Sequence, residues 1–130
     1  MKARNLGESF RFAAIGVVQA FKSERNIRVH LAAAVLVVLL SSALGLGRLE
    51  TAIVALAAVI VIVAEMVNTA LEHLVDMVTA EYHPLAAKVK NIAAGAVLTA
   101  AVGAAVVGIM IFGPRLVSMI SGAEDHYAYY

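Results

Sequence analysis

A long apolar run, residues 51–64, leads without a break into a stripe of acidic and amide side chains. At 100° per residue, Glu65, Asn68, Glu72 and Asp76 fall within about 80° of one another on a helical wheel. Like charges four residues apart repel, and an acid inside an apolar run costs about 2.5–3.5 kcal/mol on insertion scales. The stripe therefore needs a compensating group, and a divalent cation is the natural candidate.

The composition requires lipid as the solvent for most of the chain. Of 130 residues, 62% are hydrophobic, whereas soluble domains contain about 45–50%. A soluble protein of this size has too little interior to bury so many apolar side chains. The sequence contains no cysteine, which excludes disulfides and thiolate metal sites. It contains no dense basic patch with interleaved aromatic residues, so we expect no nucleic-acid partner.

The basic residues predict the orientation in the membrane. Six of the ten lysines and arginines lie in the first 28 residues, and Lys88 and Lys90 lie in the second long polar segment. Arg48 is in the short loop between the first two apolar runs, and Arg115 follows the last run. The positive-inside rule therefore places the N-terminus and residues 80–91 in the cytoplasm. A cleaved signal peptide is the alternative for the first run, but the polar leader is too long for one.

The apolar runs predict one all-α membrane-embedded domain over residues 1–130, with three transmembrane helices and an N-terminal amphipathic surface helix. The expected segments are an amphipathic cytoplasmic part (1–29), three crossings (30–47, 51–80 and 85–113) and a tail (114–130). The first crossing is short, so we expect it to continue a helix that begins in SERNIRVH.

Local signals predict where these helices begin and end. Phe10 and Phe21 share one face of the N-terminal helix, which either lies in the membrane surface or packs on the crossings. Ser23 is a candidate cap for the next helix. The third helix is expected to follow Pro84 and to end at Pro114.

The acidic stripe, Glu24 and the two lysines are expected to gather at one membrane face. Carboxylates and phosphate oxygens suit Mg²⁺, and a lysine suits a phosphate. A carboxylate at the lipid edge can act as a general base. Together these groups predict phosphoryl transfer to a lipid hydroxyl.

Each residue of the stripe also has a structural alternative. Glu65 could be protonated and hydrogen-bonded to a neighbouring helix, and Asn68 could link two helices. Glu72 and Asp76 could be ordinary acids of the membrane interface.

Four segments, in this order and spacing, resemble the prokaryotic diacylglycerol kinase family. They are SERNIRVHLAAA, AEMVNTALEHLVD, EYHPLAAKVK and AAGAVL. The segments NTALEH, HPLA and IFGPRL resemble its Gram-positive undecaprenol kinase branch. The resemblance covers roughly residues 5–115.

The resemblance implies a multi-pass kinase of the bacterial inner membrane that uses ATP and Mg²⁺ to phosphorylate a lipid alcohol. Undecaprenol is the expected substrate, and diacylglycerol is the alternative. The family forms homotrimers whose active sites are shared between neighbouring chains. By resemblance, Glu65 is the catalytic base and contacts the substrate together with Asn68, while Glu24 and Glu72 bind Mg²⁺. The residues implied to bind the nucleotide are Phe12, Glu24, Glu72, Asp76, Glu81, Tyr82, His83, Lys90 and Asn91.

Two positions depart from the family pattern. Phe12 stands where relatives often carry tyrosine, which keeps a stacking surface and loses a hydroxyl. Asn91 stands where the family usually has aspartate, which removes a charge near the metal. A non-enzymatic membrane carrier or an inactive relative is a further alternative, because small carriers also use a mid-helix acid to couple protons. A carrier needs neither Glu24 nor Lys90, which argues against it.

Overall fold

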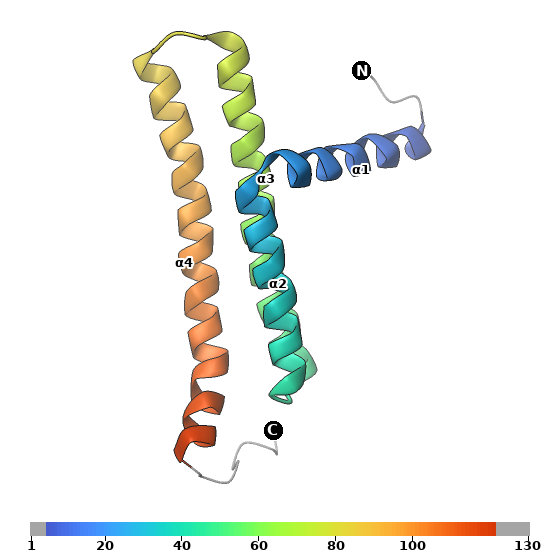
Figure 1. The fold of residues 1–130 in the computed structure, drawn as a ribbon, viewed down its shortest axis with the longest axis vertical. Helices are drawn as coiled ribbons and strands as arrows, with labels where there is room; N and C mark the ends of the chain where they lie inside the picture. The colour runs from blue at the N-terminus through green and yellow to red at the C-terminus, as the bar shows by residue number, and fades with distance from the viewer. Residues whose placement is uncertain (1–4, 122–130) are drawn as a thin grey trace.

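The computed structural model describes residues 5–121, which form four helices and no strand (Figure 1). The helices are α1 (Leu6–Ser23), α2 (Arg25–Ala43), α3 (Arg48–Val78) and α4 (Pro84–Ser121). The last three are long and apolar enough to cross a membrane. The all-α fold with three candidate spans is therefore confirmed. The start of α2 at Arg25 also confirms that the first crossing continues the SERNIRVH helix.

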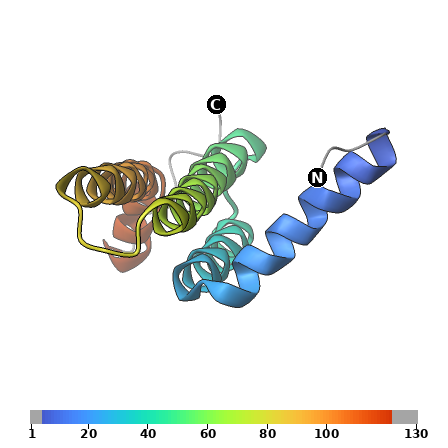
Figure 2. The same ribbon diagram turned by 90° about the horizontal axis from the view of Figure 1, so that it is seen from above.

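Helix α1 points away from the other helices in both views (Figures 1 and 2). Its first turn is capped by Asn5, whose side-chain oxygen accepts a hydrogen bond from the Glu8 backbone at 2.8 Å. None of its residues is buried, and Phe10 is 76% exposed. The alternative that α1 packs on the crossings of its own chain is therefore wrong. Its apolar face is left available to lipid.

A single residue, Glu24, separates α1 from α2 and forms an elbow. The Arg28 guanidinium donates hydrogen bonds to the carbonyl oxygens of Phe21 (3.2 Å) and Lys22 (3.1 Å) at the end of α1. A cation is favourable there because the last carbonyls of a helix carry a partial negative charge. The predicted cap is wrong: Ser23 is the last residue of α1, and Glu24 holds the N-cap position of α2 without a side-chain bond.

Helix α3 is the centre of the bundle, because both α2 and α4 pack against it. With 19 residues in α2 and 31 in α3, α3 extends about 18 Å past the start of α2. Figure 1 shows this extension, paired with the first turns of α4, beyond the level of the elbow. The bundle thus has an apolar part beside α2 and a two-helix extension that carries the polar end of α3.

At the end of the bundle opposite the elbow, Arg115 of α4 bonds to the end of α2 and to the start of α3. Its guanidinium donates to the carbonyl oxygens of Leu44 (3.2 Å) and Gly45 (3.1 Å) and pairs with Glu50 at 3.1 Å. Glu50 also accepts a 2.8 Å hydrogen bond from the backbone N–H of Gly47, the residue that caps the start of α3. Helix α3 therefore begins at Arg48, three residues before the expected start at Thr51. One side chain therefore joins three helix ends. Gly45 has a φ of 64°, a conformation that glycine adopts without strain.

Helix α4 continues through Pro114 to Ser121, so the expectation that Pro114 ends the helix is wrong. A proline inside a helix removes one backbone donor and bends the helix without always ending it. The last turns of α4 leave the axis of the preceding part in Figures 1 and 2. The first part of the predicted tail is thus helical, and residues 122–130 lie outside the described residues.

Candidate functional site

The first two residues of the polar stripe of α3 are buried. Glu65 is 4% exposed, Asn68 is 8% exposed and Thr69 is also buried, although apolar residues surround them in the sequence. Sequence reasoning missed Thr69. Its position four residues after Glu65 places it on the same helix face and could have revealed it.

Asn68 has one satisfied and one unsatisfied end. Its Nδ2 donates to Glu72 Oε1 at 3.1 Å, while its buried Oδ1 has no hydrogen-bond partner among the described residues. An ionised carboxylate only accepts hydrogen bonds, so the amide nitrogen must face Glu72 and the oxygen must face away. A buried acceptor without a donor costs about 1–3 kcal/mol. The Asn68 oxygen therefore indicates a missing donor, such as a hydroxyl group.

Glu65 makes no hydrogen bond or ion pair with the part of the chain that the structure describes. The alternative of a simple hydrogen bond to a neighbouring helix is thus not seen within residues 5–121. A buried carboxyl group without a partner is costly, which favours a functional role.

Asp76 and Lys90 join the exposed end of the stripe to α4. Lys90 Nζ lies 2.5 Å from Asp76 Oδ1, and the two side chains are 36% and 61% exposed, respectively. Exposed ion pairs contribute only about 0–1 kcal/mol to stability. The pair therefore contributes little to the stability of the fold. Its consequence is that a lysine cation lies beside the acidic stripe.

We expect Lys90→Met to change stability by less than about 1 kcal/mol. If Lys90 binds a phosphate, the same substitution removes a charge-assisted bond and raises the KM for ATP about 10- to 100-fold. The matched control is Lys88→Met, which removes a lysine two residues away. Thermal unfolding and initial rates over an ATP series measure both effects. An unchanged KM for ATP in the Lys90 variant would exclude Lys90 from the nucleotide site.

The other predicted site residues make no hydrogen bond or ion pair with the stripe within residues 5–121. Glu24 is half-buried at the elbow, and its side chain makes no hydrogen bond to the part of the chain that the structure describes. Phe12 lies twelve residues, about 18 Å, before the elbow along α1. Tyr82 is 85% exposed at the tip of the extension. The remaining three are also exposed: Glu81, His83 and Asn91.

His83 has a local structural role. Its Nδ1 accepts a hydrogen bond from the Leu85 backbone at 3.2 Å, in the first turn of α4. Among residues 5–121, no group of three or more histidine, aspartate and glutamate side chains is placed to hold a metal ion. The predicted pair of carboxylates, Glu24 and Glu72, would therefore need further ligands from phosphate or water.

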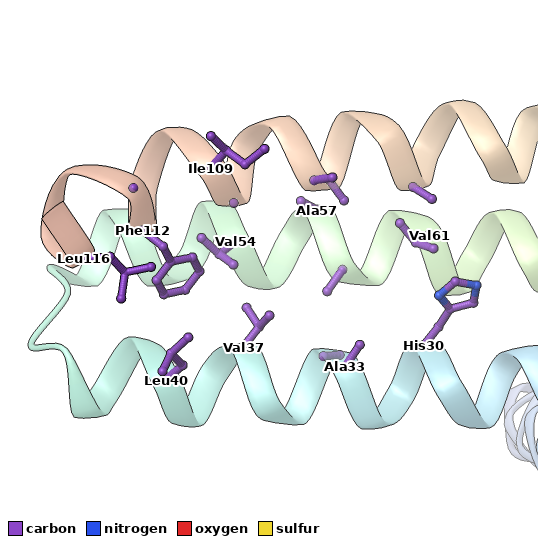
Figure 3. A pocket seen from close by; sticks show the side chains of 17 residues that line it. His30, Ala33, Val37, Leu40, Val54, Ala57, Val61, Ile109, Phe112 and Leu116 are labelled. Carbon is purple, nitrogen blue, oxygen red and sulfur yellow. The ribbon is translucent and has the colours of Figure 1, made fainter.

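An apolar groove of about 520 Å³ lies between α2 and α4, with α3 as its floor (Figure 3). Of its 17 lining residues, 16 are apolar, and the exception is His30. Figure 3 shows His30 beside Val61 at one end and Phe112 with Leu116 toward the other. Sequence reasoning missed the groove, because most of its lining residues are alanine, valine and glycine, which also line ordinary helix contacts.

The chain is similar to one known protein family and to two named relatives. The family model of prokaryotic diacylglycerol kinase matches residues 11–112. A diacylglycerol kinase from Synechocystis sp. is 43% identical over 119 residues, which is 91% of this chain and 68% of that protein. An undecaprenol kinase from Bacillus subtilis is 38% identical over 109 residues, which is 84% of this chain and 89% of that protein. These relatives are named for different lipids.

Proposed function

The chain belongs to the prokaryotic diacylglycerol kinase family and is a multi-pass membrane lipid kinase, and from this premise we propose that it transfers the γ-phosphate of ATP to undecaprenol. The observation that carries the proposal is the buried pair Glu65 and Asn68, because among residues 5–121 neither the Glu65 side chain nor the buried Asn68 oxygen has a hydrogen-bond partner. Both are hydrogen-bond acceptors, and the hydroxyl group of a lipid alcohol supplies a donor for one of them.

The residues of the stripe fit the chemistry of transfer to a hydroxyl. Either Glu65 or the Asn68 oxygen can accept the one hydrogen bond that the hydroxyl donates, but only the carboxylate can take its proton. As that proton passes to Glu65, the hydroxyl oxygen bonds to the γ-phosphorus. The bond from this phosphorus to the β,γ-bridging oxygen breaks, and ADP leaves with the bond's electrons.

Glu24 and Glu72 are the residues that would hold Mg²⁺. Magnesium is commonly bound by one or two carboxylates, with phosphate oxygens and water completing its octahedral coordination. Glu72 uses Oε1 for Asn68, and its second oxygen makes no hydrogen bond to the described residues. When bound, the metal neutralises charge that develops on the phosphates.

The separation of the nucleotide residues supports a site shared between chains. Phe12 is on the outlying helix α1, whereas Tyr82 is at the tip of the α3–α4 extension. We therefore propose a homotrimer in which a neighbouring chain completes each site. With the elbow end in the cytoplasm, as the positive-inside rule predicts, the acidic stripe meets MgATP from that side.

Undecaprenol is preferred to diacylglycerol because NTALEH, HPLA and IFGPRL resemble the undecaprenol kinase branch. Diacylglycerol stays as the second candidate because the relative with 43% identity is named for it. A carrier or an inactive relative is less well supported, since a carrier needs no lysine beside the acidic stripe and Lys90 pairs with Asp76 there.

We expect kcat/KM for undecaprenol to exceed that for diacylglycerol at least about tenfold, a difference of about 1.4 kcal/mol in transition-state binding. The measurement is transfer of ³²P from ATP to each alcohol in mixed micelles, with magnesium varied. Equal values for the two alcohols would contradict the proposed substrate. Absence of transfer to either would favour the carrier or the inactive relative.

A further inference from the structure

Two residues of the described chain bury a side-chain hydroxyl, and they differ in what that hydroxyl contacts. Ser41 of α2 is fully buried, and its Oγ donates to the carbonyl oxygen of Val37 at 2.8 Å. Thr69 of α3 is 7% exposed, and its hydroxyl makes no hydrogen bond to the described residues. A hydroxyl in a helix commonly bonds to the carbonyl four residues earlier, as Thr99 of α4 also does at 2.8 Å. The Thr69 hydroxyl is therefore a buried donor that its own helix backbone does not use.

A buried acceptor, the Glu65 carboxyl group, lies one helical turn away on the same face of α3. Glu65 stands four residues before Thr69, and side chains at this spacing are neighbours on the surface of a helix. Glu65 is 4% exposed and also has no hydrogen-bond partner among residues 5–121. Burial of an unpaired donor or of an unpaired carboxylate is costly, and a bond between the two groups removes both costs.

Thr69 is the residue of α3 best placed to donate to Glu65. Within one turn of Glu65 on either side, the only residues of α3 with a side-chain donor are Asn68 and Thr69. The amide nitrogen of Asn68 faces Glu72. Threonine occupies either of two χ1 rotamers in a helix, and its hydroxyl hydrogen rotates toward an available acceptor. Hydrogen bonds of catalytic groups often tighten only when the substrate binds, so we expect the bond to Glu65 to form in the complex.

We propose that Thr69 is a positioning residue whose hydroxyl donates to one carboxylate oxygen of Glu65. The bond holds the carboxylate in one orientation, so that its second oxygen faces the hydroxyl of the acceptor alcohol. A carboxylate has two accepting oxygens, so the two donors do not compete. Thr69 keeps its own proton throughout, and the proton of the alcohol passes to the second oxygen of Glu65. The inference rests on the proposed kinase function and adds a residue that acts through the base.

The first test is the rate of lipid phosphorylation in Thr69→Val, which removes the hydroxyl and keeps a β-branched side chain. We expect kcat for undecaprenol to fall about tenfold and KM for ATP to stay within about twofold, because Thr69 acts on the base and not on the nucleotide. Thr69→Ser restores the hydroxyl and should return kcat to within about threefold of the wild type. The matched control is Thr99→Val, which removes a hydroxyl already bonded within α4 and should change neither constant. Wild-type kinetics in Thr69→Val would overturn the proposal.

A double variant tests whether Thr69 acts through Glu65. Added to Glu65→Gln, Thr69→Val should lower the residual rate by less than about twofold, because the base that it positions is already absent. A further tenfold loss would mean that Thr69 acts independently of the base, against the proposal. The competing donor is His30 of α2, which lies beside Val61, one turn of α3 before Glu65 (Figure 3). A loss of kcat in His30→Phe but not in Thr69→Val would assign the donor to α2 instead.

An infrared measurement separates this proposal from the kinase assignment. Spectra of the intact protein in detergent are recorded with and without undecaprenol, and the carboxyl band of Glu65 is identified by its loss in Glu65→Gln. A hydrogen bond shifts the stretching band of a carboxyl group. Thr69→Val should therefore move this band, and Thr69→Ser should restore it, even if no phosphate transfer is detected. An identical band in the wild type and in Thr69→Val under both conditions would overturn the proposal, even for an active kinase.

Discussion

Replacement of Glu65 by glutamine is expected to reduce lipid phosphorylation about 10³-fold, within the range for loss of a general base. The affinity for MgATP should stay within about twofold, because glutamine keeps the size of the side chain and its capacity to hydrogen-bond and removes its ability to take a proton. Glu65 is 4% exposed, and burial of a neutral amide costs less than burial of a carboxylate. The variant should therefore fold.

The measurement pairs transfer of ³²P from ATP to undecaprenol with equilibrium binding of MgATP to the same preparation. Glu72→Gln is the informative comparison, because Glu72 is one helical turn from Asn68 and is assigned to the metal. It should weaken MgATP binding, whereas Glu65→Gln should not. A Glu65→Gln variant that loses nucleotide affinity and retains turnover would contradict the assignment of Glu65 as the base.

The order of the helices and the acidic stripe could be predicted because both depend on local periodicity. Residues 65, 68, 72 and 76 share one helix face whatever the helix contacts, and the apolar run before them requires a lipid environment. The bond from Asn68 to Glu72 joins residues four apart, so it too follows from helix geometry. These parts of the site require no knowledge of the tertiary structure.

The features that the sequence did not reveal depend on contacts between distant residues. Arg115 bonds to Leu44, Gly45 and Glu50, which stand 65 to 71 positions before it in the chain. Its charge alone therefore indicated only the flank of a membrane span. The elbow depends on Arg28 reaching back to the carbonyls of Phe21 and Lys22. The groove depends on how α2 and α4 are spaced over α3. No pattern within one helix encodes that spacing.

The second large effect is expected at the opposite end of the bundle, where Arg115→Met should lower the free energy of unfolding by about 2 kcal/mol. The guanidinium side chain is 25% exposed and makes three bonds, to Leu44, Gly45 and Glu50. Hydrogen bonds to charged groups contribute about 1.5–3 kcal/mol each when buried, and partial exposure reduces the total. Methionine keeps the apolar stem and removes only the bonds.

The control is Arg48→Met, because Arg48 is an exposed arginine at the same end whose side chain makes no hydrogen bond to the described residues. Arg115→Lys should recover only part of the loss, since an ammonium group cannot replace the planar fork that reaches three oxygens. Thermal unfolding in detergent compares the variants, and hydrogen exchange should show faster opening of residues 116–121. Kinase activity below the unfolding transition should be unchanged, because Arg115 of α4 contacts Glu50 in the first turn of α3, fifteen residues before Glu65. Equal melting of the Arg115→Met and Arg48→Met variants would show that the Arg115 side chain does not stabilise the proline-containing end of α4.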